Sequence, residues 1–295
     1  MKPSAAPLFP LSRVELNAWL EAALGEDLAD KGDITTAAVM PQGARCQAAV
    51  VAREALVAAG LPLAAAVFRR LDSKLEIDLL VADGDVLNAG AVLMRVQGNA
   101  HAILMGERAA LNALQHLSGI ATRTHAYVRA IAGTSATLLD TRKTIPGWRK
   151  LAKYACRCGG ADNHRMGLYD AVLIKDNHVA ACGGITPAVA AAKAAGHAAI
   201  EVECDTLIEV DEALAAGASR ILLDNMALDD MRAAVRLVAG RVPLEASGGV
   251  SLETIRAIAE TGVNFISVGS ALTLSAPAID IGLDVEGVAS ENTGP

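Results

Sequence analysis

Cationic side chains suited to binding an anionic ligand are concentrated between residues 139 and 178. Eight of the chain's 26 lysines and arginines lie in these forty positions with four aspartates, although the formal net charge is −7. Arginine presents a planar fork that matches a carboxylate, and lysine offers a compact ammonium group. These charges follow apolar runs and glycine-rich turns, unlike a solvated helix face. We predict a cationic site containing Arg142, Lys143, His164, Arg165 and Lys175.

Short apolar strands must position these side chains. From residue 136 onward, an apolar run, a polar or glycine residue and a helix-like stretch recur. The predicted strand ends are Leu139 before Asp140, Ile174 before Lys175, Val202 before Glu203, Leu223 before Asp224, Ala246 before Ser247, and Val268 before Gly269. Alternating strands and helices give a parallel sheet, and α/β barrels build their sites at the carboxyl ends of the strands. We predict an α/β fold with an open barrel.

Start signals mark three of the intervening helices. Thr186 with Pro187 predicts an N-cap followed by the first helical residue, and Thr206 with Glu209 forms a capping box. Ser251 is predicted to cap a third helix.

The chain before the barrel predicts an α+β domain. Ser12 and Glu15 form a capping box for a helix that Gly25 would end. After it we expect a loop at 26–36, strands at 46–59, 75–81 and 91–96, a helix at 61–72, and a long helix from 107 to about 131. In the long helix, Leu111, Leu114 and Leu117 share an apolar face, and Arg108 lies on a polar one.

Small residues and carboxylates at the later strand ends suit a phosphorylated sugar. Ser247-Gly248-Gly249 and Val268-Gly269-Ser270 can close backbone N–H groups on a phosphate, a recurrent feature of the last two barrel strands. Glu203 and Asp224 can hold Mg²⁺ through oxygen or accept ribose hydroxyls. Alternatively, these two carboxylates only balance the neighbouring cations.

Composition excludes several other classes. The acidic net charge and scarce aromatic residues disfavour nucleic-acid binding. We predict no membrane span, because the longest uncharged apolar stretch, 55–68, contains glycine and proline and is too short. Five cysteines without a C-x-x-C spacing favour a reducing cytoplasm over a disulfide framework. A metal site at Cys156, Cys158 and His164 is disfavoured against buried packing thiols.

Several stretches resemble the quinolinate phosphoribosyltransferase family of NAD biosynthesis. They are residues 107–112, 117–121, 140–144, 157–160, 163–178, 222–226, 245–249 and 266–269. The run from Asn163 to His178 is the most specific of them. The resemblance implies an N-terminal α/β sandwich domain, an open barrel of the type II phosphoribosyltransferases, and a homodimer or higher oligomer with shared active sites. We place the sandwich at 1–121 with 278–295, and the barrel at 122–277.

The resemblance also implies a reaction and its residues. Quinolinate and phosphoribosyl pyrophosphate would give nicotinate mononucleotide, pyrophosphate and CO₂, with Mg²⁺ as cofactor. Quinolinate would be held by Arg142, His164, Arg165 and Lys175, with Arg108 from the neighbouring subunit. Lys143, Glu203 and Asp224 would face phosphoribosyl pyrophosphate and, with Lys175, form the catalytic set. The remaining binding residues would be Thr141, Ser247, Gly248, Gly249, Val268, Gly269 and Ser270.

One of three departures from the family pattern, which lie at Trp148, at Ala161-Asp162 and at Leu274, bears on these expectations, as do two alternatives. Leu274 stands where the family commonly has histidine, so no role is transferred to that position. The first alternative is an enzyme of the same fold that acts on another heteroaromatic acid without decarboxylation. The second is a phosphate-sensing regulatory module, which would have no use for the converging cations and carboxylates.

Overall fold

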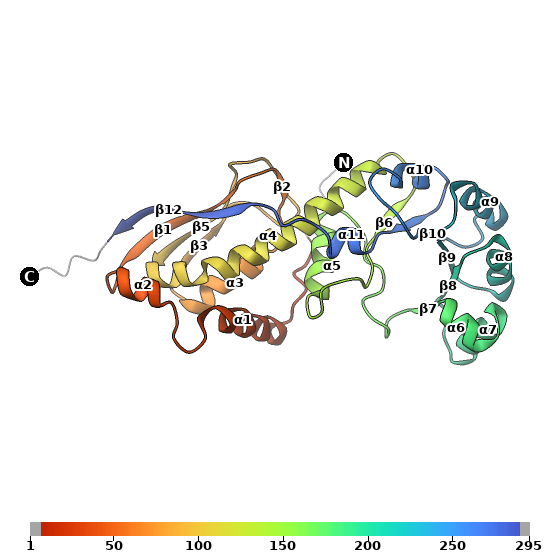
Figure 1. The fold of residues 1–295 in the computed structure, drawn as a ribbon, viewed down its shortest axis with the longest axis horizontal. Coiled ribbons are helices and arrows are strands. Elements are labelled where there is room, and N and C mark those ends of the chain that lie inside the picture. Colours follow the sequence, from red (N-terminus) through yellow and green to blue (C-terminus); the bar gives the residue numbers. More distant parts are fainter. Residues whose placement is uncertain (1–6, 290–295) are drawn as a thin grey trace, which may run out of the picture. The chain divides into compact units, whose positions relative to one another are not determined.

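The computed structural model describes residues 7–289, which form two compact units (Figure 1). The first unit comprises the described residues up to Arg123, the segment Lys150–Gly160, and the described residues from Ala276 onward. The second comprises Thr124–Arg149 and Ala161–Ser275. Segment Lys150–Gly160 therefore packs with the first unit, although the predicted division placed it in the barrel.

An antiparallel sheet forms one layer of the first unit. Its strand order is β12-β1-β5-β3. The strands are β1 (Arg45–Ala52), β3 (Glu76–Leu79), β5 (Val92–Asn99) and β12 (Ile281–Ala289), and β2 (Leu56–Val57) pairs separately with β4 (Val86–Leu87). Strand β12 thus completes a sheet begun more than two hundred residues earlier in the chain.

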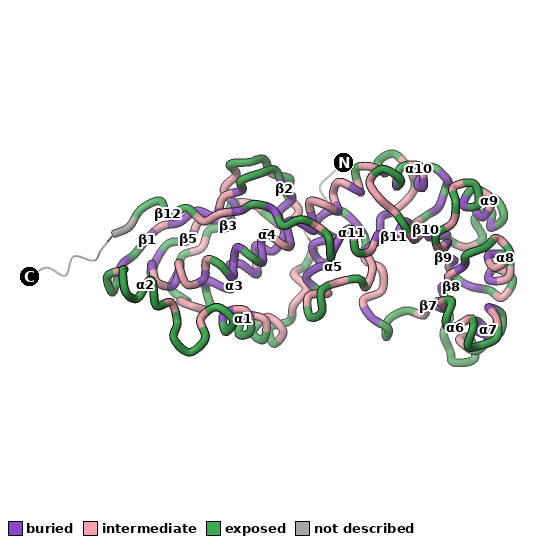
Figure 2. Tube along the Cα trace, in the orientation of Figure 1, coloured by how far each residue is buried: buried purple, intermediate pink, exposed green. Residues whose placement is uncertain are grey.

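Helices form the other layer of the first unit. They are α1 (Arg13–Leu28), α2 (Ile34–Val39), α3 (Leu61–Leu71) and the first part of α4 (Ala100–Ala130), and α5 (Arg149–Cys158) lies largely in this unit. Leu111 and Leu114 of α4 join Phe68 of α3 and Val50 of β1 in one buried cluster. Figure 2 shows buried stretches along α3 and α4. Burying this apolar area between sheet and helices is the main favourable contribution to folding of the unit.

The second unit is an open α/β barrel. Its six parallel strands follow the order β6-β11-β10-β9-β8-β7, and β6 and β7 are the two edges. The strands are β6 (Thr137–Leu139), β7 (Val172–Ile174), β8 (Ile200–Cys204), β9 (Arg220–Asp224), β10 (Leu244–Ser247) and β11 (Phe265–Ser267). They are short and rich in Val, Ile and Leu, as buried parallel strands are.

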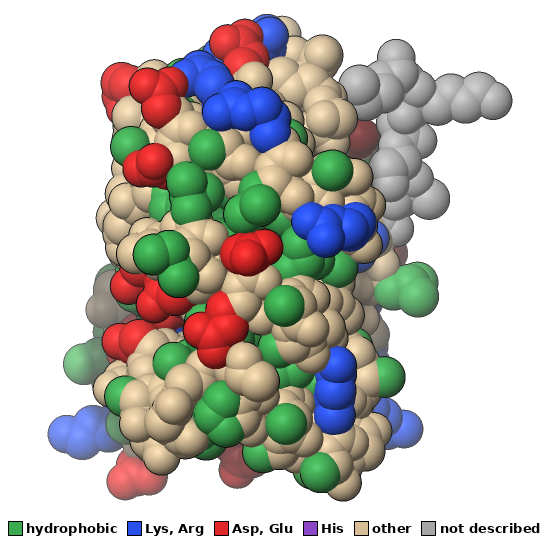
Figure 3. Space-filling model, turned by 90° about the vertical axis from the view of Figure 1, so that its right-hand side faces the viewer, with side chains coloured by type: hydrophobic (Ala, Val, Ile, Leu, Met, Phe, Trp, Pro, Cys, Tyr) green, Lys and Arg blue, Asp and Glu red, His purple; other side chains and the backbone are tan. Residues whose placement is uncertain are grey.

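Helices accompany these strands. They are α6 (Asp176–Cys182), α7 (Ile185–Ala194), α8 (Leu207–Ala216), α9 (Leu228–Val238), α10 (Ile255–Ala259) and α11 (Ser270–Thr273). Helix α9 shows why they form: Met231, Ala234 and Val238 are buried on one face, and Asp229 and Asp230 favour its N-terminal turn. In Figure 3, acidic and basic side chains are interspersed on the face that it shows.

Several predicted boundaries in the first unit are wrong. Helix α1 continues past Gly25 to Leu28, and the Ala29 N–H bonds the Gly25 carbonyl. Part of the expected loop at 26–36 is helical, because Asp33 accepts the Thr36 N–H and caps α2. The strand expected at 46–59 is divided into β1 and β2.

Two predicted helix caps in the barrel are also wrong. Helix α7 begins at Ile185 after Gly184, and the Thr186 N–H and hydroxyl instead donate to Glu212. Helix α10 begins only at Ile255, because a turn follows Ser251. The capping boxes at Ser12 and Thr206 are confirmed.

Candidate active site

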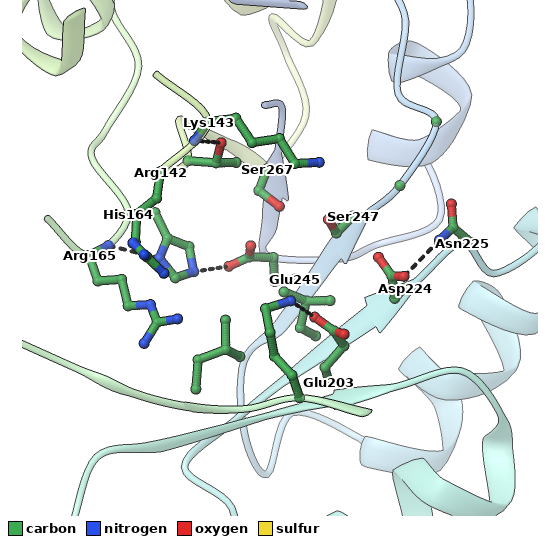
Figure 4. Close-up of a pocket in the computed structure, with 16 residues that line it drawn as sticks. Arg142, Lys143, His164, Arg165, Glu203, Asp224, Asn225, Glu245, Ser247 and Ser267 are labelled. Carbon is green, nitrogen blue, oxygen red and sulfur yellow. Dashed lines mark hydrogen bonds and ion pairs between the residues drawn. The ribbon is translucent and has the colours of Figure 1, made fainter. Parts of the chain in front are cut away.

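A pocket of about 570 Å³ lies at the carboxyl ends of the barrel strands (Figure 4). The predicted site residues that line it are Thr141, Arg142, Lys143, His164, Arg165, Lys175, Glu203, Asp224, Ser247, Gly248 and Gly249. The pocket is also lined by Leu173, Leu222, Asn225, Glu245 and Ser267. The structure therefore brings most of the predicted set around one cavity within the second unit.

A buried aspartate organises the cationic side of the pocket. Asp140, directly after β6, is fully buried. It accepts a hydrogen bond from the His164 backbone N–H at 2.9 Å and from Asn163 Nδ2 at 2.5 Å. A buried carboxylate requires such donors. Asp140 thereby holds the segment that carries His164 and Arg165 beside the segment that carries Arg142.

The two arginines of this side are suited to an anionic ligand. Burial, and next the charge of Arg142, lower the pKa of Arg165. Nη1 of Arg165 donates to the Ala171 carbonyl at 3.1 Å. Nε of Arg142 is buried and has no hydrogen-bond partner among the described residues. Neighbouring guanidinium groups repel each other. A carboxylate bound between them relieves this repulsion and is stabilised by both groups.

Carboxylates at the ends of β8 and β9 form the opposite side. Glu203 accepts a hydrogen bond from Nζ of Lys175, and Asp224 accepts one from Asn225 Nδ2 at 2.6 Å. The two carboxylates line the same cavity and offer only oxygen, the donor that Mg²⁺ prefers. The donor set therefore fits Mg²⁺ and equally fits ribose hydroxyls.

A tight turn after β10 completes this side. Gly248 has a φ of +90°, and a Cβ added to it would lie 2.1 Å from Oδ1 of Asn225. The Asn225 N–H donates to the Ser247 carbonyl at 2.9 Å, which draws the ends of β9 and β10 together. Glycine is required at 248 both by its backbone conformation and by this close approach.

Four predicted site residues do not line the pocket. Val268 is buried and donates its N–H to the Leu139 carbonyl. Gly269 lies against the pocket residue Lys143, because an added Cβ would be 2.7 Å from Cδ of Lys143. Ser270 begins α11. Arg108 is exposed on α4 in the first unit, so its role stays a prediction.

The sequence analysis missed a cluster of charged side chains around the pocket residue His164. Glu201 of β8 and Glu245 of β10 lie beside His164, and Arg220 of β9 forms ion pairs with both glutamates. Glu201 and Glu245 precede Glu203 and Ser247 by two residues, the spacing that returns to the same face of a strand. That spacing could have identified both glutamates.

The pKa values of these two glutamates are shifted in opposite directions. Burial alone would raise the pKa of Glu201, but the hydrogen bond from His164 and the charge of Arg220 outweigh it and lower this pKa. Burial, and next the charge of Glu201, raise the pKa of Glu245 to about 7. His164, Glu201 and Glu245 also bring ligand atoms within 4.8 Å of one another, as a metal site would. Arg220 already supplies their counter-charge, since its Nη2 lies 2.8 Å from Glu245.

These features define a class of protein. Convergent guanidinium, ammonium and carboxylate groups at the carboxyl ends of barrel strands are the site of an α/β-barrel enzyme with anionic substrates. None of the described helices combines the length and apolar character that crossing a bilayer requires.

Comparison with known proteins defines the family. Residues 33–118 match the description "Quinolinate phosphoribosyl transferase, N-terminal domain", and residues 120–284 match the corresponding C-terminal domain. The chain belongs to the quinolinate phosphoribosyl transferase family.

Relatives and solved structures agree with this assignment. A probable carboxylating nicotinate-nucleotide pyrophosphorylase of Synechocystis is 46% identical, covering 92% of each chain. A probable enzyme of the same name from Bacillus subtilis is 43% identical, covering 93% of this chain and 95% of the relative. The structure of the nicotinate-nucleotide pyrophosphorylase from Francisella tularensis is 40% identical, covers 96% of this chain and 100% of its own, and superposes with a TM-score of 0.90.

Proposed function

We propose that this enzyme transfers the phosphoribosyl group of phosphoribosyl pyrophosphate to quinolinate and releases CO₂, forming nicotinate mononucleotide in NAD biosynthesis. The observation that carries the proposal is the division of one pocket into a cationic side and a carboxylate and glycine side. A dicarboxylate and a phosphorylated sugar are complementary to these two sides. The names of the relatives, which include a decarboxylating quinolinate phosphoribosyltransferase of Nicotiana glauca, support the same reaction.

Quinolinate occupies the cationic side in this proposal. Arg142 and Arg165 receive its carboxylates through paired N–H donors, and Lys175 adds an ammonium group. Nζ of Lys175 already donates a hydrogen bond to Glu203, which fixes the position of the ammonium group before quinolinate binds. The orientation aims the pyridine nitrogen at the ribose, and such positioning supplies a large part of the rate enhancement of a two-substrate reaction.

Phosphoribosyl pyrophosphate occupies the other side. Glu203 and Asp224 accept hydrogen bonds from its ribose hydroxyls, and Lys143, which lies against Gly269, faces its pyrophosphate. The turn at Ser247–Gly249 receives the 5′-phosphate. Glu203 and Asp224 would hold Mg²⁺, which would neutralise negative charge on the pyrophosphate. Positive charge develops on the ribose as pyrophosphate departs, and the two carboxylates stabilise it electrostatically.

Decarboxylation follows from the bond that the pyridine nitrogen makes. The nitrogen lone pair forms the bond to the ribose carbon as the bond to pyrophosphate breaks. As CO₂ departs, the electron pair of the broken carbon–carbon bond stays on C2, and the adjacent positive nitrogen stabilises this ylide. A proton then replaces CO₂ at C2 and gives nicotinate mononucleotide.

Product analysis tests the proposal against the alternative of a non-decarboxylating enzyme. The protein is incubated with phosphoribosyl pyrophosphate, Mg²⁺ and quinolinate labelled in its C2 carboxylate. We expect nicotinate mononucleotide and labelled CO₂ in equal amounts, and an incubation with nicotinate as the control acid should release none. A nucleotide that retains the label, or no nucleotide at all, would refute the decarboxylating activity.

We further propose that the enzyme is a homodimer in which Arg108 contributes to the partner's site. Arg108 is exposed on α4, beside the buried Ala109 and Ala110, so its side chain is available to a second copy. If so, Arg108→Ala and Lys175→Ala are each nearly inactive alone. After subunit exchange, about a quarter of wild-type sites should be intact, because half of a random mixture is heterodimer with one intact site. Exchange shown by mass spectrometry without recovered activity would place Arg108 outside the partner's site.

We also place this enzyme in the cytoplasm. All five cysteines are free thiols, and four of them, Cys46, Cys156, Cys158 and Cys204, are buried. Fractionation of cells that carry a tagged chain tests this location; recovery with an organelle would contradict it.

A further inference from the structure

Arg149, the first residue of α5, joins the two irregular segments of the cationic side. Its Nε donates to Oγ1 of Thr144 at 3.4 Å, and its Nη1 donates to the Met166 carbonyl at 3.2 Å. Thr144 directly follows Lys143, and Met166 directly follows Arg165. Lys143 and Arg165 line the pocket (Figure 4), but Arg149 does not. One guanidinium group outside the pocket therefore bonds the neighbours of two pocket cations.

The Met166 end of this bridge belongs to a closed turn. Asp170 accepts the Met166 N–H at 2.7 Å and the N–H of the buried Gly167 at 3.0 Å. Because Asp170 binds its N–H and Arg149 binds its carbonyl, Met166 is held on both sides. The backbone that directly follows Arg165 is thereby fixed.

The Thr144 end is anchored to the last helix of the barrel. The Lys143 carbonyl accepts the hydroxyl of Thr273 in α11, and the Thr144 N–H donates to the Arg142 carbonyl at 3.0 Å. Thr273 is buried, so solvent does not compete for this anchor. Arg149 therefore connects an anchored segment, which carries Lys143, to the closed turn at Met166.

Two contacts bracket the pocket cations along the chain. The contact through Asp140 precedes the cations of both segments, and the contact through Arg149 follows them. The first contact alone would leave the spacing of the two segments unset beyond the cations. Arg149 supplies the second point that fixes this spacing.

The chemistry of arginine suits this bridging role. Its five N–H donors form a fixed planar fork, so one side chain can bond oxygens of two segments. Both partners of Arg149 are neutral oxygens, and it forms no ion pair with another described residue. A cation in the first turn is also unfavourable for α5 itself. The position of Arg149 is therefore explained by the two segments and not by the helix.

We propose that Arg149 is a positioning residue that couples the two substrate subsites. It holds the neighbours of Lys143 and Arg165 at one spacing, so the order of one segment depends on the order of the other. A ligand that orders one segment then lowers the entropic cost of binding a second ligand at the other. The identity of the ligands rests on the proposed function; the bridge through Arg149 does not.

Hydrogen exchange of the ligand-free enzyme tests the bridge. Arg149→Lys keeps the charge but loses the planar fork, so we expect amide exchange to become about threefold faster or more in both segments, 140–148 and 161–171, from the usual size of one hydrogen bond. Thr144→Val removes one acceptor, and adding it to Arg149→Lys should have less than an additive effect. Unchanged exchange, a change confined to α5 or to one segment, or full additivity would overturn the bridge.

Lys150→Gln is the matched control. Lys150 is the next cation of α5, but it pairs with Glu15 at 2.5 Å and bonds neither segment. The substitution removes a positive charge beside Arg149 and keeps both of its bonds. We expect exchange in the two segments to match wild type. Equal acceleration in Lys150→Gln and Arg149→Lys would show that the segments respond to the charge of α5 and not to the bridge.

Calorimetry tests the coupling. The Kd for phosphoribosyl pyrophosphate with Mg²⁺ is measured with and without saturating phthalate, which has two adjacent carboxylates but no ring nitrogen and so cannot react. We expect phthalate to lower this Kd about fivefold or more in wild type and in Lys150→Gln, and by less than about twofold in Arg149→Lys. A protein that is merely less stable would keep the wild-type ratio.

Two calorimetric outcomes would overturn the coupling role. One is a wild-type ratio below about twofold, and the other is a ratio in Arg149→Lys equal to that of wild type. If wild type binds neither ligand, the proposed function fails and the coupling fails with it, whereas the exchange rates still decide whether Arg149 bridges the two segments.

Discussion

The two sides of the pocket are built by different means. Most of the cationic side comes from irregular segments at 140–148 and 161–171, which Asp140 ties together. The opposite side comes from the ends of β8, β9 and β10, where register in the sheet fixes Glu203, Asp224 and Ser247. The ends of parallel strands lie at one level of a barrel because the sheet register fixes them. Irregular segments have no such register, so buried side chains such as Asp140 must hold them in place. We therefore expect the cationic side to be the more sensitive to changes of its supporting residues.

Removing Mg²⁺ should have the largest effect on turnover, and it should affect the two sides of the pocket differently. Chelation is expected to abolish phosphoribosyl transfer, because the pyrophosphate charge is no longer neutralised. Quinolinate affinity, measured by calorimetry, should change by less than about twofold, since the cations that bind it are part of the protein. A large loss of quinolinate affinity on chelation would place the ion on the cationic side.

Arg165→Lys should be the largest single substitution effect on the cationic side. Lysine cannot make two parallel bonds to a carboxylate, so kcat/KM for quinolinate should fall tenfold or more, from about 1.5 to 3 kcal/mol for one charge-assisted bond. Arg157→Lys is the control, because Arg157 is exposed and lies outside the pocket. Activity of Arg165→Lys within about a factor of two of wild type would reject the fork assignment.

Asp224→Asn tests the opposite side. The substitution keeps the shape but removes the charge, so we expect affinity for phosphoribosyl pyrophosphate to fall and quinolinate binding to stay nearly unchanged. Separate calorimetric titrations measure both, with the exposed Asp229→Asn on α9 as control. Equal losses for the two ligands would mean that Asp224 supports the fold instead of the ribose.

The smallest expected effect is that of Gly248→Ala. The positive φ disfavours any side chain, and the new Cβ would displace Asn225. We expect a loss of about 1–2 kcal/mol in the free energy of unfolding, measured by urea denaturation, with weaker phosphoribosyl pyrophosphate binding. Gly249→Ala should be milder, because its φ is +59° and no atom lies within 4 Å of the added Cβ. Equal effects would show that the contact with Asn225 is unimportant.

Strand ends were predictable from sequence, and long-range partners were not. Glu203 and Asp224 could be identified because a polar residue follows an apolar run in each case. Glu245 was missed because it lies inside a strand, where a buried charge is stable only beside partners such as Arg220 on another strand.

The assignment of residues 150–160 to the first unit shows the same limit. Tyr154 of α5 donates its hydroxyl to Asp83 at 2.6 Å, a contact between residues far apart in the chain. Nothing in the local pattern of α5 specifies that partner, and its position between two barrel strands in sequence predicted the wrong neighbour.

The number of carboxylates that the cationic side recognises is the central claim, and one calorimetric comparison tests it. Quinolinate, with two adjacent carboxylates, and nicotinate, with one, are titrated into the same wild-type protein. We expect quinolinate to bind at least about tenfold more tightly, since the second carboxylate adds a charge-assisted bond to a guanidinium group. Equal affinities would contradict the claim that Arg142 and Arg165 together recognise a dicarboxylate.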